Sequence, residues 1–257
     1  MSTKIIVGLT TTPIRINNIG KTLISLLSQT IIPDEIVLTI PLFSARFNTP
    51  YDITDRLLLR LIEKKMVILN KIEHDYGPAT KFVGLLTRDY QSDDILIWVD
   101  DDIAYKPTVI EYLITPLKNN ANITTGLSGF NFYSNGMYNK VLTYMGQAEI
   151  IEGFAGVASY KKNMPIINEL CKWGIRPQTH DSFIDANDIQ RAQFLSDDYT
   201  ISMFFKKTDI KTVIVCDNGK SHGNYLGVLE IGYKSDALHN QPGGNMYNYN
   251  LLRNMGV

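Results

Sequence analysis

The first hundred residues alternate between short apolar runs and stretches with helical spacing, and this alternation constrains the fold more than any other feature. Four apolar runs are predicted strands, at Lys4–Leu9, Glu35–Ile40, Met66–Leu69 and Ile95–Val99. Between them, apolar residues recur every three or four positions, which is typical of helices. Strands and helices that alternate in this way form a mainly parallel sheet with helices on both faces, and solid apolar strands suit that burial. The expected fold class is therefore α/β.

The second half of the chain is less regular. Glycine-interrupted strands are expected within residues 124–132 and 150–160, and a late strand at Thr212–Cys216. Helices are predicted within residues 17–29, 55–65, 81–90, 163–173 and 196–207. The last forty residues, rich in Gly, Asn and Tyr, are predicted to form loops. Neither an internal repeat nor a linker divides the 257 residues, so we expect one domain.

Composition excludes several classes of protein. The formal net charge is −1, without a long basic run, which argues against a nucleic-acid partner. No apolar stretch approaches the ~20 residues of a membrane span. The two cysteines are far apart, and the first residues do not read as a signal peptide, so we expect a reducing, cytoplasmic location.

The strongest chemical signal is VDDDIAY, in which three carboxylates, Asp100 to Asp102, directly follow a buried strand. Adjacent carboxylates repel one another unless a cation neutralises them. Oxygen ligands of this kind suit Mg²⁺ or Mn²⁺, which also bridge substrate phosphates. The alternative is a solvated acidic loop, and the abrupt change from ILIWV to DDD favours the metal.

A second acidic pair, Asp197 and Asp198, opens a predicted helix for which Ser196 is the expected N-cap. Favourable charge at the positive end of the helix dipole would explain the pair without any function. A catalytic base is the other interpretation, and the two are compatible.

The order of LTTTPIRI, SLLSQ, DYGPATK, VDDDIAY, EGFAGVASY and SDDYTIS resembles the nucleotide-sugar glycosyltransferases of the GT-A fold. The similarity is greatest to family-2-like enzymes and to virus-encoded members of that group, and it spans about residues 4–207. It implies a single Rossmann-like domain. In that domain, residues 1–105 would form the nucleotide-binding half, about 106–216 the acceptor and catalytic half, and about 217–257 a loop-rich segment.

The resemblance also implies roles for individual residues. It assigns the divalent cation to Asp100 and Asp102, with His222 as a candidate third ligand, and the general base to Asp198, assisted by Asp197. The residues implied in nucleotide-sugar binding are Thr10, Arg15, Asp75, Lys81, Asp100, Asp101 and Gly156. Of these, Asp75 is suited to accept a hydrogen bond from a base, and Lys81, at the head of a helix, to reach a phosphate.

The predicted function is a Mn²⁺- or Mg²⁺-dependent glycosyltransferase. It would move a sugar from a nucleotide diphosphate donor to a hydroxyl of a glycan or glycoprotein acceptor, with inversion. A UDP-sugar is the favoured donor, and a GDP-sugar is the alternative. Two other classes stay open, namely a catalytically silent sugar- or nucleotide-binding module on the same fold, and a phosphotransferase that uses the same acidic motif.

Overall fold

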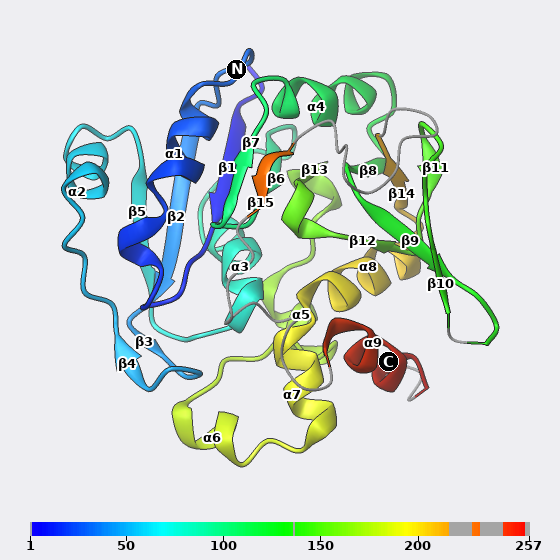
Figure 1. Cartoon of the computed structure of the whole chain (residues 1–257). Coiled ribbons are helices and arrows are strands. Elements are labelled where there is room, and N and C mark those ends of the chain that lie inside the picture. Colours follow the sequence, from blue (N-terminus) through cyan, green and yellow to red (C-terminus); the bar gives the residue numbers. More distant parts are fainter. Residues whose placement is uncertain (1, 136, 216–227, 232–243, 255–257) are drawn as a thin grey trace.

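The computed structural model describes residues 2–135, 137–215, 228–231 and 244–254, and helices cover both faces of its central sheet (Figure 1). Within these residues the sheet has eight strands, in the order β11-β14-β8-β13-β6-β1-β2-β5. They are β1 (Ile5–Leu9), β2 (Glu35–Pro41), β5 (Ile68–Ile72), β6 (Ile95–Trp98), β8 (Ile123–Gly126), β11 (Gly146–Gln147), β13 (Val157–Tyr160) and β14 (Lys211–Ile214).

The sheet is mainly parallel, as predicted. Strand β1 runs parallel to β2 and β6, β2 to β5, and β8 to β14. Strand β13 is antiparallel to both of its neighbours, and β11 is antiparallel to β14. The α/β fold class with a mainly parallel central sheet flanked by helices is confirmed.

Two apolar cores lie on opposite faces of this sheet, because successive side chains of a strand point to opposite sides. Val7 packs in one core and its neighbour Ile6 in the other. The first core is closed by α1 (Gly20–Leu27), α2 (Arg56–Glu63) and α4 (Val109–Asn119). The second is closed by α3 (Thr80–Leu86), α5 (Ile167–Lys172) and α8 (Asp197–Lys207).

A smaller antiparallel sheet, β10-β9-β12, carries a third core. Its strands are β9 (Gly129–Phe132), β10 (Tyr138–Lys140) and β12 (Ile150–Ile151), and α7 (Asp188–Leu195) and α9 (Gly244–Asn254) pack beside it. The Tyr249 ring of α9 stacks on Phe130 and Tyr199, at centroid distances of 5.9 Å to each. The C-terminal helix is thereby attached to α8, which begins at the second acidic pair.

The remaining elements connect these layers. They are the hairpin β3 (Phe43–Ser44) and β4 (Thr49–Pro50), the pair β7 (Ile103–Tyr105) and β15 (Val228–Ile231), helix α6 (His180–Ile184), and four 3₁₀ turns at Ile16–Asn18, Gly77–Ala79, Gly153–Ala155 and Lys161–Asn163.

Several predictions of secondary structure need correction. The third predicted strand begins two residues later than expected, at Ile68. Helix α4, with Pro116 inside it, helices α6 and α7, and strand β7 were not predicted. The last forty residues include strand β15 and helix α9 rather than loops alone, because tertiary pairing with β7 and the aromatic stack of Tyr249 hold them.

Candidate active site

The candidate site lies at the carboxyl ends of β1 and β6, where the strand order of the sheet reverses. Strand β1 has β2 on one side and β6 on the other, and Gly8 pairs with Trp98 near the ends of both strands. Ligands of open α/β sheets bind at such switch points. Residues 10–12 follow β1 and residues 100–102 follow β6, so the two predicted segments meet at this edge.

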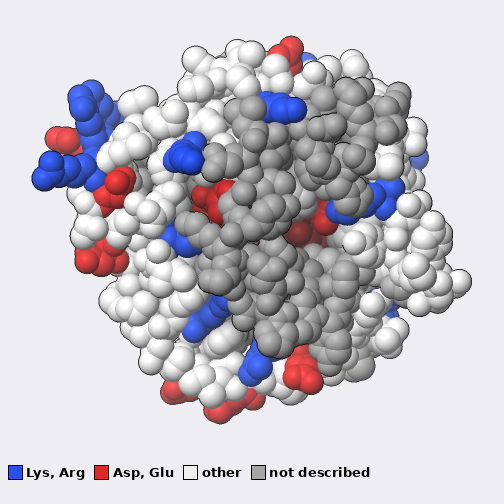
Figure 2. Space-filling model, in the orientation of Figure 1, with Lys and Arg blue, Asp and Glu red and all other residues white. Residues whose placement is uncertain are grey.

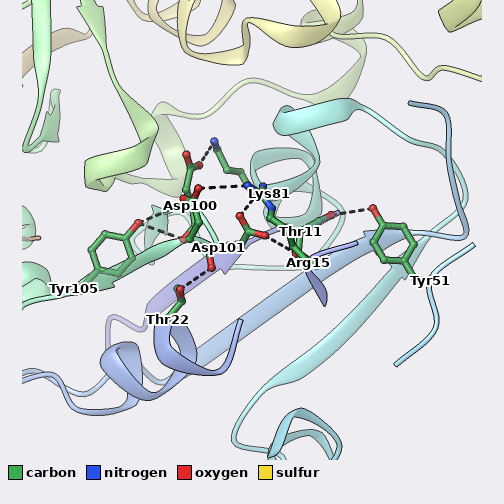
Figure 3. Close-up of polar contacts among 9 residues, drawn as sticks. Thr11, Arg15, Thr22, Tyr51, Lys81, Asp100, Asp101 and Tyr105 are labelled. Atoms are coloured by element: carbon green, nitrogen blue, oxygen red, sulfur yellow. Dashed lines mark hydrogen bonds and ion pairs between the residues drawn. The ribbon is translucent and has the colours of Figure 1, made fainter. Parts of the chain in front are cut away.

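Asp101 anchors the acidic turn. Its carboxylate accepts a hydrogen bond from Thr11 Oγ1 at 2.5 Å and pairs with Arg15 Nη2 at 2.8 Å (Figure 3). Its backbone carbonyl accepts from Thr22 Oγ1 of α1 at 2.7 Å. Burial raises the pKa of Asp101, and the Arg15 guanidinium and the Thr11 hydroxyl oppose this shift. The central acid is thus held inside the protein, and its two neighbours flank it.

Asp100 is positioned through both its backbone and its side chain. Its backbone N–H donates to the Tyr105 hydroxyl at 3.1 Å, and that hydroxyl donates to the Phe154 carbonyl at 2.8 Å. Its carboxylate lies 2.7 Å from Lys81 Nζ, and its side chain is 33% exposed. The carboxylate is therefore oriented by protein groups and still open to a ligand.

Lys81, in the first turn of α3, connects the two acidic clusters. Its ammonium also lies 3.0 Å from Asp197 Oδ2, at the start of α8. Burial lowers the pKa of Lys81, but the charges of Asp100, Asp197 and Asp198 outweigh it and leave that pKa well above the ordinary value. The residue therefore stays protonated as a permanent internal cation.

Asp198, the neighbour of Asp197 at the start of α8, belongs to the second acidic cluster around Lys81. Its Oδ1 accepts a hydrogen bond from the Gly153 backbone N–H at 2.9 Å. A Cβ atom at residue 153 would lie 2.9 Å from that oxygen and 3.3 Å from Lys81 Nζ, so a larger residue there would displace one of these side chains. Burial, followed by the charge of Asp197, raises the pKa of Asp198 well above its ordinary value. Ser196 occupies the N-cap position as expected, but its side chain makes no capping hydrogen bond.

Asp102 is the least compensated of the three consecutive acids. Among the described residues it pairs with Arg15, whose Nη1 lies 3.4 Å from Oδ2, and its side chain is 17% exposed. Burial, followed by the charges of Asp100 and Asp101, raises the pKa of Asp102 to about 7. A cation at this position would relieve the repulsion.

We expect the metal-free protein to lose stability as the pH rises from about 4 to about 7. In that window the unfolded chain releases the Asp102 proton at its ordinary pKa of 3.8, whereas the folded protein holds the proton until about 7. The folded state then binds more protons than the unfolded state, so the free energy of unfolding falls as the pH rises. Thermal unfolding in EDTA across this range should give Asp102→Asn a shallower slope than the wild type. Equal slopes would contradict the assignment.

Asp75 lies at the same edge of the sheet, beyond β5. It is buried, and its two carboxylate oxygens accept from the backbone N–H groups of Ala45 and Gly77, each at 2.8 Å. Tyr51 stands between Asp75 and the acidic turn: its hydroxyl donates to the Thr11 carbonyl at 2.9 Å. Burial, followed by the charge of Asp75, raises the pKa of Tyr51, so the phenol stays neutral.

The other predicted residues are placed differently. Gly156 has a φ of +100°, and a Cβ there would meet Leu113, Val99 and Val109 in the core. That conformation accounts for glycine at 156, and its predicted contact with a sugar stays a prediction. Thr10 is half-buried directly after β1, and His222 lies outside the described residues.

Three site residues were not predicted from the sequence: Thr22, Tyr51 and Tyr105. Tyr105 belongs to the motif VDDDIAY, so its position next to the acids was a usable signal. Thr22 carried none, because an ordinary helical threonine gives no sign of the loop that it contacts.

The carboxylates at this site suit a divalent cation that binds together with a phosphate ligand. In the described part of the chain, no group of three or more His, Cys, Asp and Glu is arranged to hold a metal. Asp100 and Asp102 offer two partly exposed carboxylates. Magnesium is commonly held by one or two carboxylates together with substrate phosphates and water.

Comparison with known proteins gives fold-level similarity only. No protein-family model and no curated protein sequence matches the chain. The solved structure of 4-diphosphocytidyl-2C-methyl-D-erythritol synthase is similar with a TM-score of 0.47 and 8% identity, over 85% of this chain and 91% of that one.

Two other solved structures are similar over a smaller share of their length. GalNAc-T7 with UDP, GalNAc and Mn²⁺ has a TM-score of 0.48 and 13% identity, over 83% of this chain and 42% of that one. Glucosyl-3-phosphoglycerate synthase from Mycobacterium tuberculosis, in complex with Mn²⁺, UDP and glucosyl-3-phosphoglycerate, has a TM-score of 0.41 and 13% identity, over 63% and 58%. Similarity at this level assigns no function, which therefore has to be inferred from the site.

Acidic side chains are visible near the middle of the face shown in Figure 2, as well as at its left and lower edges. Lysines and arginines gather over α2 at the left edge and also occur across the face. Among the described helices, none combines the length and the apolar character that crossing a membrane requires.

Proposed function

We propose that this chain is a metal-dependent glycosyltransferase that moves a sugar from a nucleotide diphosphate donor, with a UDP-sugar favoured, to a hydroxyl of a glycan acceptor. One observation carries the proposal: two acidic clusters, one after β6 and one at the start of α8, meet across the Lys81 ammonium. Transfer from a diphosphate to a hydroxyl needs two acidic functions, one holding a cation against the leaving group and one taking a proton. The two acidic clusters, which lie at one edge of the sheet, are the proposed source of both functions.

On the donor side, the nucleotide would lie over the ends of β1 and β5. Thr10, Arg15 and Asp75 are the proposed contacts to the base and ribose, and Asp101 holds Arg15 in place at 2.8 Å. Tyr51 adds a neutral aromatic wall between Asp75 and Thr11. Gly156 is the proposed position at which the donor sugar approaches the backbone.

Asp100 and Asp102 are the proposed ligands of Mn²⁺ or Mg²⁺, and His222 is a proposed third ligand. When bound, the cation supplies positive charge that stabilises the departing diphosphate. Tyr105 holds the Asp100 backbone, Lys81 contacts the Asp100 carboxylate, and Arg15 contacts Asp102. The two acids are thereby positioned before a ligand arrives.

On the acceptor side, Asp198 is the proposed general base. Its Oδ1 is held by the Gly153 N–H, which leaves Oδ2 to accept the proton of the acceptor hydroxyl. In the proposed step, the acceptor oxygen bonds to the anomeric carbon as the bond from that carbon to the phosphate oxygen breaks. The proton passes to Asp198, the nucleoside diphosphate leaves, and the anomeric configuration inverts. Asp197, which is paired with Lys81, assists by maintaining the charge balance.

A combined binding and turnover experiment tests the proposed function. UDP together with Mn²⁺ should raise the apparent stability of the protein by about 2.7 kcal/mol at a UDP concentration one hundred times the Kd. Mixtures of UDP-sugars with Mn²⁺ should release UDP, and GDP-sugars should release less GDP. Binding without release would indicate a silent module, and release of inorganic phosphate would indicate a phosphotransferase. No stabilisation by any nucleotide would contradict the proposal.

A further inference from the structure

Lys81 is a buried cation that already occupies one of the proposed metal ligands. Its side chain is 4% exposed, and its ammonium is within ion-pair distance of only two carboxylates among the described residues, Asp100 at 2.7 Å and Asp197 at 3.0 Å. A buried ammonium needs such partners, because an unpaired charge in the interior is strongly unfavourable. The lysine is therefore held between the two acidic clusters.

The contacts of Asp197 show that its carboxylate is not fully hydrogen-bonded in this arrangement. In the part of the chain that the structure describes, Asp197 Oδ2 is buried and accepts no well-directed hydrogen bond. Its ion-pair partner among the described residues is the Lys81 ammonium, at 3.0 Å. The Lys81 ammonium thus has one firm hydrogen bond, to Asp100, and one looser electrostatic contact, to Asp197.

A divalent cation at Asp100 has to share that carboxylate with the ammonium. Two like charges on one carboxylate repel each other strongly where little water screens them. A diphosphate reverses the balance, because its negative oxygens attract both the ammonium and the divalent cation. The same lysine therefore opposes a free cation and favours a cation that arrives with a diphosphate.

We propose that Lys81 makes the acidic site a poor binder of free divalent cations, so that the cation is retained only together with a nucleoside diphosphate. The inference rests on the proposed function, since it takes Asp100 and Asp102 as the metal ligands. It assigns Lys81 a positioning role in addition to its predicted contact with phosphate. The protein is thereby kept from holding a cation without a donor.

The test measures the binding of Mn²⁺ in the absence of nucleotide, by electron paramagnetic resonance of the free ion and by calorimetry. Lys81→Met should bind Mn²⁺ at least about tenfold tighter than the wild type, because about 1.4 kcal/mol of repulsion corresponds to that factor. Lys81→Arg, which keeps the charge, should resemble the wild type. Lys140→Met is the matched control: Lys140 is also a largely buried lysine, 12% exposed, but it pairs with Glu152. Its Mn²⁺ affinity should be unchanged.

A second variant covers the case in which Lys81→Met does not fold. Lys81→Met combined with Asp197→Asn removes both members of the looser pair and leaves the net charge of the site as in the wild type. It should also bind Mn²⁺ alone more tightly, because Asp100 is released. Equal or weaker Mn²⁺ binding by the folded variants would overturn the proposal.

The wild-type protein provides an independent measurement. Its affinity for Mn²⁺ should be at least about a hundredfold higher with saturating UDP than without it, which corresponds to about 2.7 kcal/mol of coupling. Tight binding of Mn²⁺ in the absence of UDP would overturn the role of Lys81. Failure of UDP to bind at all would instead overturn the proposed function, and the comparison of variants with Mn²⁺ alone still decides the role of Lys81.

Discussion

Asp198→Asn should lower turnover by roughly 10²–10⁴-fold, the usual scale for loss of a general base. The amide oxygen can still accept the hydrogen bond that the Gly153 N–H now donates at 2.9 Å, so the loop and the helix should keep their positions. What the variant lacks is a group able to take the acceptor proton. Donor affinity should change little, since the role proposed for Asp198 is toward the acceptor and not the donor. The measurements are steady-state UDP release and the UDP dissociation constant.

Asp197→Asn is the matched control for that variant. Asp197 is the neighbouring acid on the same helix, but it is paired with Lys81 at 3.0 Å, which makes it less available to a hydroxyl. Its substitution should lower turnover less than Asp198→Asn does. Near-normal turnover of Asp198→Asn, or a product that keeps the anomeric configuration of the donor, would show that the proposed mechanism is wrong.

Asp102→Ala should abolish the effect of metal on nucleotide binding. In the wild type, we expect UDP to bind at least about tenfold tighter with Mn²⁺ than with EDTA, a difference of about 1.4 kcal/mol. Asp102 is one of only two proposed carboxylate ligands. Burial, followed by the charges of Asp100 and Asp101, raises its pKa to about 7, and a bound cation would favour its charged form. In the variant, calorimetry should give the same UDP affinity with Mn²⁺ and with EDTA.

The control is Asp93→Ala, which removes a surface carboxylate before β6, at the opposite end of that strand. Asp93 is 70% exposed and pairs with Lys162, so its loss should leave the metal effect intact. An Asp102→Ala protein that folds normally and still binds UDP more tightly with Mn²⁺ would remove Asp102 from the metal site. It would leave the role proposed for Asp198 open to its own test.

Much of the fold followed from local patterns. The strands β1, β2 and β6 are apolar runs covered on both faces, and α1, α2 and α8 show helical spacing that a short window reveals. Helix α4 was harder to predict, because Pro116 inside it removes one backbone hydrogen-bond donor and so disfavours a helix. Helix α9 contains glycine, asparagine and tyrosine, which are poor or middling helix formers. Its Tyr249 stacks on aromatic rings that are remote in sequence.

Local patterns were enough to predict the α/β class and the edge of the sheet where the acids lie, since the end of an apolar strand is visible in a few consecutive residues. The pairing of Lys81 with Asp100 and Asp197, and the contact of Gly153 with Asp198, are visible only in the folded chain. The difference lies in the range of the interactions. Burial patterns arise from neighbouring residues, whereas the energy of an ion pair depends on the distance between charges that the folded chain alone brings together.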